Sequence, residues 1–306
     1  MSASGSIVLR QAHAKINLAL AVGPPQEPRG YHPICSWFAR IDLADEVRIE
    51  RLPSGPSRFE IRWASDAPYQ SPIDWPVERD MTARAHRLME SHVGGVLPVA
   101  VSVNKRVPVG GGLGGGSSDA AAMLTGLREL FGLKISDSTL TDLGLSLGSD
   151  VPFFALAAAG SAIVEGLGEH ITPLAPLSAS ILLIVPPFGC PTGDVYRAFD
   201  AMKSSGDEAA FERRAQRVRV LAREAARAGR LPDDLFNDLT EPAMRVAPTL
   251  GEIRERAHAK SDKPVFVTGS GSTLFIPAHD AAEAASLAAK LSTQLRGCAL
   301  LPARLC

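Results

Sequence analysis

Residues 108–119 read Pro-Val-Gly-Gly-Gly-Leu-Gly-Gly-Gly-Ser-Ser-Asp, and this stretch says most about the fold and the function of the chain. Its six glycines let successive backbone N–H groups turn toward one anion with no Cβ in the way. The alanine-rich stretch Ala120–Leu124 follows directly, and the start of a helix there would add free N–H groups and a partial positive charge. We therefore interpret the loop as a cradle for the phosphates of a polyphosphate.

The glycine loop is framed by a strand pattern and a helix pattern. Val99, Val101 and Val103 alternate with small or polar residues, which predicts a strand. After the loop, apolar residues recur at helical spacing, namely Ala120, Met123, Leu124, Leu127 and Leu130. Flexible linkers usually have polar residues on both sides, so this frame favours a binding loop over a linker. A tight structural turn is the alternative.

The loop differs from two common phosphate-binding motifs. No Gly-Lys-Ser/Thr follows it, so it is not a P-loop, and a lysine for the outer phosphates must come from elsewhere in the chain. Gly110, Gly112 and Gly115 satisfy the Gly-x-Gly-x-x-Gly spacing of dinucleotide sites. Such sites also need a second strand that ends in an acidic residue about 20 positions on, and we find none.

Composition excludes several classes of protein. The chain has 306 residues, of which 45% are hydrophobic, so it can bury a large core and form two domains. A formal net charge of −1 argues against a nucleic-acid or membrane-surface partner, and the arginines of residues 207–230 interleave with acidic residues. Met1–Ser6 lacks the order of a signal peptide, and no apolar run approaches the ~20 residues that span a bilayer. We expect a cytoplasmic protein with reduced, unpaired thiols at Cys35, Cys190, Cys298 and Cys306.

Strands and helices mix along the chain without a strict βαβ order. Ile7–Val22 alternates as a strand, with Lys15 and Asn17 together on its polar face, and a second strand-like region ends at Ile49. Periodicity and capping residues predict helices at Asp80–His92, Ser136–Leu147, Asp207–Arg230, Glu241–His258 and Asp280–Leu295. Short strands are predicted at Ile181–Val185, Val265–Thr268 and Leu274–Ile276. This mixture favours an α+β fold, with a domain boundary near residue 160.

Phosphoryl transfer requires more than a phosphate cradle, because the acceptor hydroxyl must be oriented or deprotonated. Asp150 follows a predicted helix, and Pro152 disfavours helical dihedrals at Val151, which would give the chain a sharp exit. If Lys15 were its neighbour, the ammonium would keep the carboxylate ionised and both could touch a substrate hydroxyl. Taken singly, Asp150 is as well suited to cap the next segment as to act as a base. Lys15 taken singly has the position of an exposed strand lysine.

The chain resembles the GHMP kinase superfamily in three segments, namely Ala14–Leu18, Pro108–Ala122 and Thr268–Ser272. Further segments resemble the branch that acts on a cytidine diphosphate substrate. They are Gly30-Tyr31-His32, Gly148–Phe153, Val164–Glu169, Pro191-Thr192 before Tyr196, and Asn237-Asp238-Leu239. The matching segments run from residue 12 to about residue 276 in the order of the family.

This resemblance implies a two-domain α+β kinase with its active site in the interdomain cleft. Residues 1–160 would form the ATP-binding domain and residues 161–306 the substrate-side domain, with the tail after about residue 295 packing on the N-terminal domain. The implied reaction uses ATP and Mg²⁺ to phosphorylate the tertiary 2-hydroxyl of cytidine diphosphate methylerythritol, in the non-mevalonate isoprenoid pathway.

The resemblance also implies roles for residues. Asp150 would be the general base and Lys15 its partner, which stabilises charge as the alkoxide develops. Ser117 or Ser118 would lie near Mg²⁺. Backbone N–H groups of the loop would hold the ATP phosphates, through Pro108, Val109, Gly110, Gly111, Gly112, Leu113, Gly114, Gly115, Gly116, Ser117 and Ser118.

Residues for the acceptor substrate follow from the same resemblance. The ring of Tyr31 would stack on the cytosine, and the imidazole of His32 would hydrogen-bond to it. Tyr196 falls where a second aromatic is common, so the base could be sandwiched between two rings. Asn17 and Thr192 would contact polar groups of the substrate.

Two alternatives remain open for the function. One is another small-molecule GHMP kinase, similar to homoserine or mevalonate kinase, although neither substrate has a base for Tyr31 and His32 to bind. The other is a ligand-sensing protein without turnover, which the presence of Lys15 and Asp150 disfavours. In each case the expected partner is a small molecule, and the protein is expected to be a monomer or a homodimer.

Overall fold

The computed structural model describes residues 6–28, 30–156, 160–202 and 207–306, and these form two compact units that interleave along the sequence. The first unit contains residues 6–14, 43–108 and 114–156. The second contains the described residues of 15–42, 109–113 and 160–306. The expectation about a signal peptide rests partly on residues 1–5, which lie outside the described residues. The predicted domains 1–160 and 161–306 stay a prediction.

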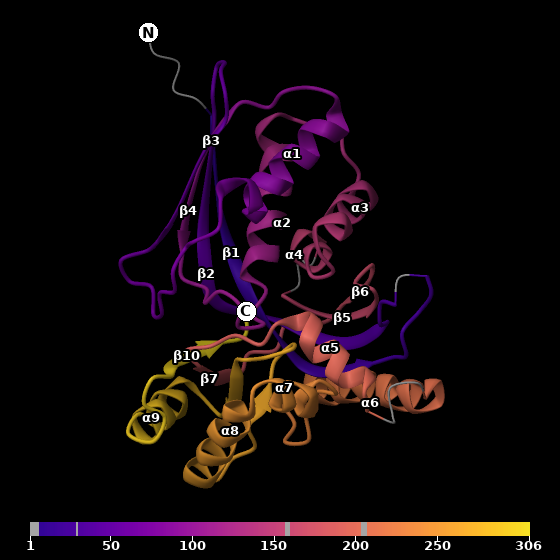
Figure 1. The fold of residues 1–306 in the computed structure, drawn as a ribbon, viewed down its shortest axis with the longest axis vertical. Helices are drawn as coiled ribbons and strands as arrows, with labels where there is room; N and C mark the ends of the chain where they lie inside the picture. Colours follow the sequence, from indigo (N-terminus) through magenta and orange to yellow (C-terminus); the bar gives the residue numbers. More distant parts are fainter. Residues whose placement is uncertain (1–5, 29, 157–159, 203–206) are drawn as a thin grey trace. The chain divides into compact units, whose positions relative to one another are not determined.

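The first unit is a sheet with helices on one face (Figure 1). Its strands are β3 (Arg58–Trp63), β4 (Val99–Lys105) and the parts of β1 (Ile7–Val22) and β2 (Ile34–Arg51) outside residues 15–42; in the sheet β3 pairs with β4, β4 with β2, and β2 with β1. The pair β2 and β4 is antiparallel with Val47 opposite Val103, whereas β3 and β4 are parallel with Ile61 opposite Val103. The other elements are η1 (Val77–Arg79), α1 (Met81–Val93), α2 (Gly115–Leu130), α3 (Asp137–Leu147) and α4 (Val151–Leu156).

Alternation along the strands places the core of the first unit between the sheet and the helices. Val101 and Val103 of β4 share one buried cluster with Met89 of α1 and with Met123 and Leu124 of α2. The predicted helix starts are confirmed by side-chain caps. Asp80 accepts a hydrogen bond from the N–H of Thr82 at 2.9 Å, and Ser136 accepts one from the N–H of Thr139 at 3.1 Å.

The second unit contains the rest of the six-stranded sheet, a separate four-stranded sheet and the remaining helices. The strands β5 (Ser161–Gly166) and β6 (His170–Pro173) extend the N-terminal part of β2. A further sheet has the order β10 (Ala299–Arg304), β7 (Ser180–Val185), β9 (Leu274–Ala278) and β8 (Phe266–Val267). The helices are α5 (Thr192–Asp200), α6 (Glu208–Ala228), α7 (Thr240–Val246), α8 (Pro248–Ser261) and α9 (Ala281–Leu291).

Two helical segments differ from what the sequence pattern indicates, and the packing of the tail on the N-terminal domain stays a prediction. The predicted helix Glu241–His258 is two helices, because Pro248 cannot donate the hydrogen bond that a continuous helix needs. Val151 begins α4 although Pro152 follows it, since proline is tolerated in the first turn of a helix. The tail after residue 295 forms β10 beside β7, and its last residues also reach β2, where Leu305 bridges to Ile41.

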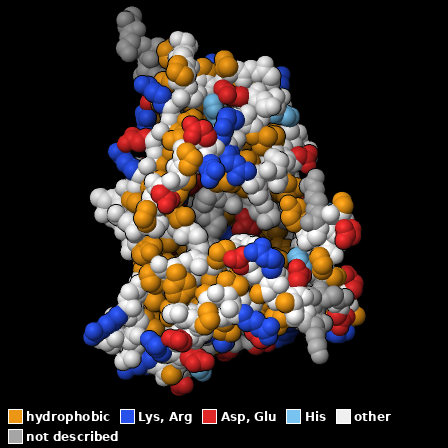
Figure 2. Space-filling model, in the orientation of Figure 1, with side chains coloured by type: hydrophobic (Ala, Val, Ile, Leu, Met, Phe, Trp, Pro, Cys, Tyr) orange, Lys and Arg blue, Asp and Glu red, His pale blue; other side chains and the backbone are white. Residues whose placement is uncertain are grey.

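The surface carries both signs of charge. In Figure 2, Lys and Arg side chains are interspersed with Asp and Glu side chains on the face that is drawn. On α6, Arg214 is paired with Asp238 at 2.7 Å and Arg219 with Glu165 at 2.6 Å. Among the described residues, no helix combines the length and the apolar character that crossing a bilayer requires.

Candidate active site

The glycine loop ends in a helix start that can bind an anion. Helix α2 begins at Gly115, four residues before the end of the quoted stretch, so Ser117 and Ser118 belong to its first turn rather than to the loop. Gly114 is the N-cap, with a left-handed φ of 73° that favours glycine. The first intrahelical bond runs from the N–H of Ser118 to the carbonyl of Gly114, which leaves the N–H groups of Gly115, Gly116 and Ser117 without an intrahelical acceptor.

The middle of the loop is held by the turn between β8 and β9. The N–H of Thr273 donates to the carbonyl of Gly111 at 3.2 Å. A Cβ on Gly112 would lie 2.8 Å from the carbonyl oxygen of Thr268 and 2.9 Å from that of Gly271, whereas one on Gly110 would meet nothing within 4 Å. Gly112 is therefore required for packing against this turn. The sequence alone indicated only that a glycine here lets the backbone approach a ligand closely.

Lys15 and Asn17 are buried, which contradicts the reading of Lys15 as an exposed strand lysine. Each is 3% exposed, and the Lys15 ammonium donates to Oδ1 of Asn17 at 2.7 Å and lies 4.7 Å from the centre of the Phe38 ring. The N–H of Asn17 donates to the hydroxyl of Thr268 at 2.8 Å, and its side-chain amide donates to Ser36 at 2.9 Å. These bonds hold Asn17 so that it orients the lysine.

Asp150 lies in the first unit, beside the start of α2. It directly precedes α4, and its side chain is half-buried. A Cβ on Gly148 would lie 3.8 Å from the hydroxyl oxygen of Ser117, so the turn that carries Asp150 is adjacent to the first turn of α2. Lys15 belongs to the second unit, so the pairing of Lys15 with Asp150 stays a prediction.

His32 and Tyr196, both assigned to the base by the resemblance, lie together in the second unit, and their role stays a prediction. Their ring centres are 5.2 Å apart, and Nδ1 of His32 donates to the carbonyl of Gly23 at 2.7 Å. Nε2 of His32 lies 3.2 Å from a carboxylate oxygen of Asp200, a residue at the end of α5 that the sequence did not indicate. Tyr31 is 57% exposed, so its ring is available to a ligand.

The turn between β8 and β9 is supported by contacts of Asn237 and Thr192 that the sequence did not indicate. The side-chain amide of Asn237 donates to the carbonyls of Val267 and Gly269, both at 2.8 Å. Thr192 reaches the same turn, with its hydroxyl oxygen 3.0 Å from that of Ser270. Burial raises the pKa of the neighbouring Asp238, while the N–H of Val22 and the guanidinium of Arg214 oppose this rise. The resemblance marked Asn237-Asp238, but only the contacts show what the pair does.

The metal donors available in the described residues are few. They contain no group of three or more His, Cys, Asp or Glu side chains that could hold a metal ion. Mg²⁺ commonly keeps several waters and binds substrate phosphates with one or two protein oxygens, so a single hydroxyl beside the phosphate loop fits it. Ser117 is half-buried, whereas Ser118 is 3% exposed.

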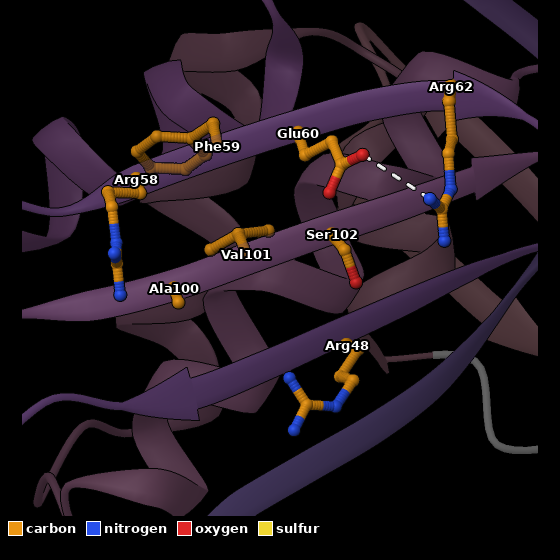
Figure 3. A pocket seen from close by; sticks show the side chains of 8 residues that line it. All are labelled: Arg48, Arg58, Phe59, Glu60, Arg62, Ala100, Val101 and Ser102. Carbon is orange, nitrogen blue, oxygen red and sulfur yellow. Dashed lines mark hydrogen bonds and ion pairs between the residues drawn. The ribbon is translucent and has the colours of Figure 1, made fainter.

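A pocket of about 380 Å³ on the outer face of the β2-β4-β3 sheet does not carry this chemistry (Figure 3). Arg48, Ser102 and Glu60 lie opposite one another in one row across the three strands. The two neighbouring rows have the reverse order, with a glutamate on β2 and an arginine on β3. Arg62 contacts Glu60 at 3.3 Å. Because acids and bases alternate and neutralise one another, we interpret this surface as a solvated sheet face.

Comparison with known proteins defines first the class of the molecule. The GHMP kinases N terminal domain matches residues 80–158, and the GHMP kinases C terminal domain matches residues 208–297. The glycine loop and the start of α2 lie within the N-terminal match, so they belong to a GHMP kinase, and the predicted α+β fold class is confirmed.

Similar sequences and structures define the family more narrowly. A 4-diphosphocytidyl-2-C-methyl-D-erythritol kinase of Nocardioides sp. is 34% identical over 92% of each chain. One of Clostridium botulinum is 39% identical over 63% of this chain, and the match spans 65% of that relative. A crystal structure of 4-(cytidine 5'-diphospho)-2C-methyl-D-erythritol kinase, 32% identical, superposes with a TM-score of 0.75 over 97% of this chain and 99% of the other. The chain belongs to the 4-diphosphocytidyl-2-C-methyl-D-erythritol kinase family.

Proposed function

We propose that the protein transfers the γ-phosphoryl group of ATP to the 2-hydroxyl of 4-(cytidine 5'-diphospho)-2-C-methyl-D-erythritol, a step in the synthesis of isoprenoid precursors. The observation that carries the proposal is the similarity, over 92% of both chains, to a relative of that name. The start of α2 and the group around His32 supply the chemical grounds, because one can bind phosphates and the other can bind a base.

Asp150 is the proposed general base and Lys15 its partner. The carboxylate of Asp150 takes the proton of the 2-hydroxyl, the oxygen forms a bond to the γ-phosphorus, and the bond to the leaving ADP oxygen breaks. The Lys15 ammonium, held by Asn17 at 2.7 Å, stabilises the negative charge that develops on the attacking oxygen. Burial strengthens this interaction, since Lys15 is only 3% exposed.

The N–H groups of Gly115, Gly116 and Ser117, with the loop before them, are the proposed ligands of the ATP phosphates. We assign the Mg²⁺-facing hydroxyl to Ser117 rather than to Ser118, because Ser118 is buried. Mg²⁺ bound with ATP would neutralise charge on the β- and γ-phosphates.

The cytosine site is proposed to consist of Tyr31, His32 and Tyr196. An exposed tyrosine ring offers a face on which a base can stack. Both ring nitrogens of His32 have partners, Gly23 and Asp200, and these contacts hold the imidazole in one orientation. A hydrogen bond from Nε2 to the base, which could distinguish cytosine from uracil, would replace the contact with Asp200. Thr192 and Asn17 are assigned to polar groups of the substrate. We further propose a cytoplasmic protein, a monomer or homodimer, that acts on a small molecule and binds neither nucleic acid nor membranes.

ADP release tests the proposal. Purified protein with ATP and Mg²⁺ should release ADP with the cytidine diphosphate substrate and not with homoserine, mevalonate or galactose. Release with one of those three alone would replace the proposed substrate by another GHMP kinase substrate. Binding of ATP without turnover of any acceptor would favour the ligand-sensing alternative.

A further inference from the structure

Both ends of the glycine loop are joined by a buried ion cluster in the first unit. Lys105 is the last residue of β4, where the chain enters the loop, and Asp119 is in the second turn of α2, where the chain has left it. The ammonium of Lys105 lies 2.5 Å from a carboxylate oxygen of Asp45 on β2 and 2.7 Å from one of Asp119. The three residues are 4%, 0% and 4% exposed, respectively, so none of them is placed to touch a nucleotide directly.

Asp45 ties the entry of the loop to the sheet. Its second carboxylate oxygen accepts hydrogen bonds from the backbone N–H groups of Arg106 and Val107, the latter at 2.8 Å. A Cβ on Gly115 would lie 2.8 Å from the side chain of Val107 and 3.6 Å from the carboxylate of Asp45. The first residue of α2 is therefore packed directly against the residues that Asp45 holds.

The charges of this cluster are costly to bury. Burial alone would lower the pKa of Lys105, but attraction by Asp119 and Asp45 outweighs burial and raises it, so the lysine stays charged. One oxygen of Asp119 is buried and has no hydrogen-bond partner among the described residues, which is unfavourable. Buried ion clusters are often no more stable than apolar groups of the same volume, although they can specify one geometry.

We propose that Lys105 is a positioning residue for ATP: by bridging Asp45 and Asp119 it fixes the first turn of α2 relative to the entry of the loop. The bridge thereby sets where the N–H groups of Gly115, Gly116 and Ser117 point. This inference rests on the proposed role of the loop in holding the phosphates. When several groups must converge on one ligand, a displacement of these groups by about 1 Å can reduce binding or rate by a large factor.

Two variants at one position isolate the bridge. Asp119→Asn and Asp119→Ala both leave one ammonium and one carboxylate, so the cluster is formally neutral in each. Asparagine still offers an oxygen to Lys105 and alanine does not. We expect the Kd for ATP, measured by calorimetry without acceptor, to rise roughly 10- to 100-fold in Asp119→Ala and less than threefold in Asp119→Asn.

A second variant and a stability control complete the test. The double variant Lys105→Met with Asp119→Asn keeps the formal charge of the cluster at −1 and should weaken ATP binding as Asp119→Ala does. Met89→Ala, a change at a fully buried residue of α1, serves as a variant that is destabilised without a change at the loop. It should keep the Kd for ATP of the wild type at a temperature where both are folded.

The outcomes separate this inference from the proposed function. Equal ATP affinity in Asp119→Asn and Asp119→Ala, or an equal loss in Met89→Ala, would overturn the positioning role. Failure of the wild type to release ADP with the cytidine substrate would overturn the proposed substrate only. A loss of ATP affinity confined to the variants that cut the bridge supports the positioning role whatever the acceptor is.

Discussion

Gly112→Ala tests whether the glycine loop is shaped by the turn between β8 and β9. The new Cβ would lie 2.8 Å from the carbonyl oxygen of Thr268 and 2.9 Å from that of Gly271, and atoms do not normally approach a Cβ below 3.0 Å. Both oxygens belong to the backbone, so neither can move aside as a flexible side chain would. The turn must shift for alanine to fit.

The expected cost has two parts. Gly112 has a φ of 76°, and a Cβ in this left-handed region costs roughly 1–2 kcal/mol. Forcing one additional carbon into a packed site adds about 1–3 kcal/mol. The free energy of unfolding should therefore fall by roughly 2–5 kcal/mol.

Gly110→Ala is the matched control, because Gly110 has nearly the same φ, 75°, but its Cβ would meet nothing within 4 Å. It should pay only the backbone strain, so the two variants should differ by about 1–3 kcal/mol in urea denaturation. Equal losses in the two variants would refute the reasoning, since strain alone would then explain both.

Three further results are expected. Asp150→Asn should lower kcat by ~10²–10⁴ with ATP affinity retained, as for loss of a general base, and turnover within threefold of wild type would contradict the assignment. Tyr31→Ala should raise KM for the cytidine substrate by roughly 5- to 150-fold, because about 1–3 kcal/mol of stacking is lost. KM for ATP should barely change. An unchanged KM for the cytidine substrate would place the base elsewhere. Burial, reinforced by Glu165, raises the pKa of Cys35 to about 12, so between pH 7 and 9 the native thiol stays protonated. Iodoacetamide should then label the exposed Cys306 first and Cys35 only after unfolding, which mass spectrometry can check.

Elements with strong local signals could be predicted from the sequence. Alternation over a long stretch gave the bounds of β1 correctly, and the capping side chains of Asp80 and Ser136 marked the starts of α1 and α3. The apolar short strands β7, β8 and β9 were also predicted, but two other short elements were not. Helix α5 has nine residues, and β6 has four that are largely exposed, so neither provides enough period to recognise.

Burial of polar residues could not be predicted in the same way. The face of β1 that carries Lys15 and Asn17 has the pattern of a solvated strand face. In the structure it is buried, and Thr268, 251 residues further along the chain, supplies the hydroxyl that accepts a hydrogen bond from the N–H of Asn17. The local residue pattern around Asn17 or Thr268 does not indicate that these two residues are hydrogen-bond partners.

Short motifs and local periodicity were enough to predict the family, the fold class and the glycine-rich start of α2, because each signal lies in residues that are neighbours in the chain. The folded structure was needed to explain why Gly112 must be glycine, what orients Lys15, and what Asp119 contacts. Each of these rests on backbone carbonyls or charges from another segment. Their positions follow from how sheets and helices pack, and a linear pattern of side chains does not record them.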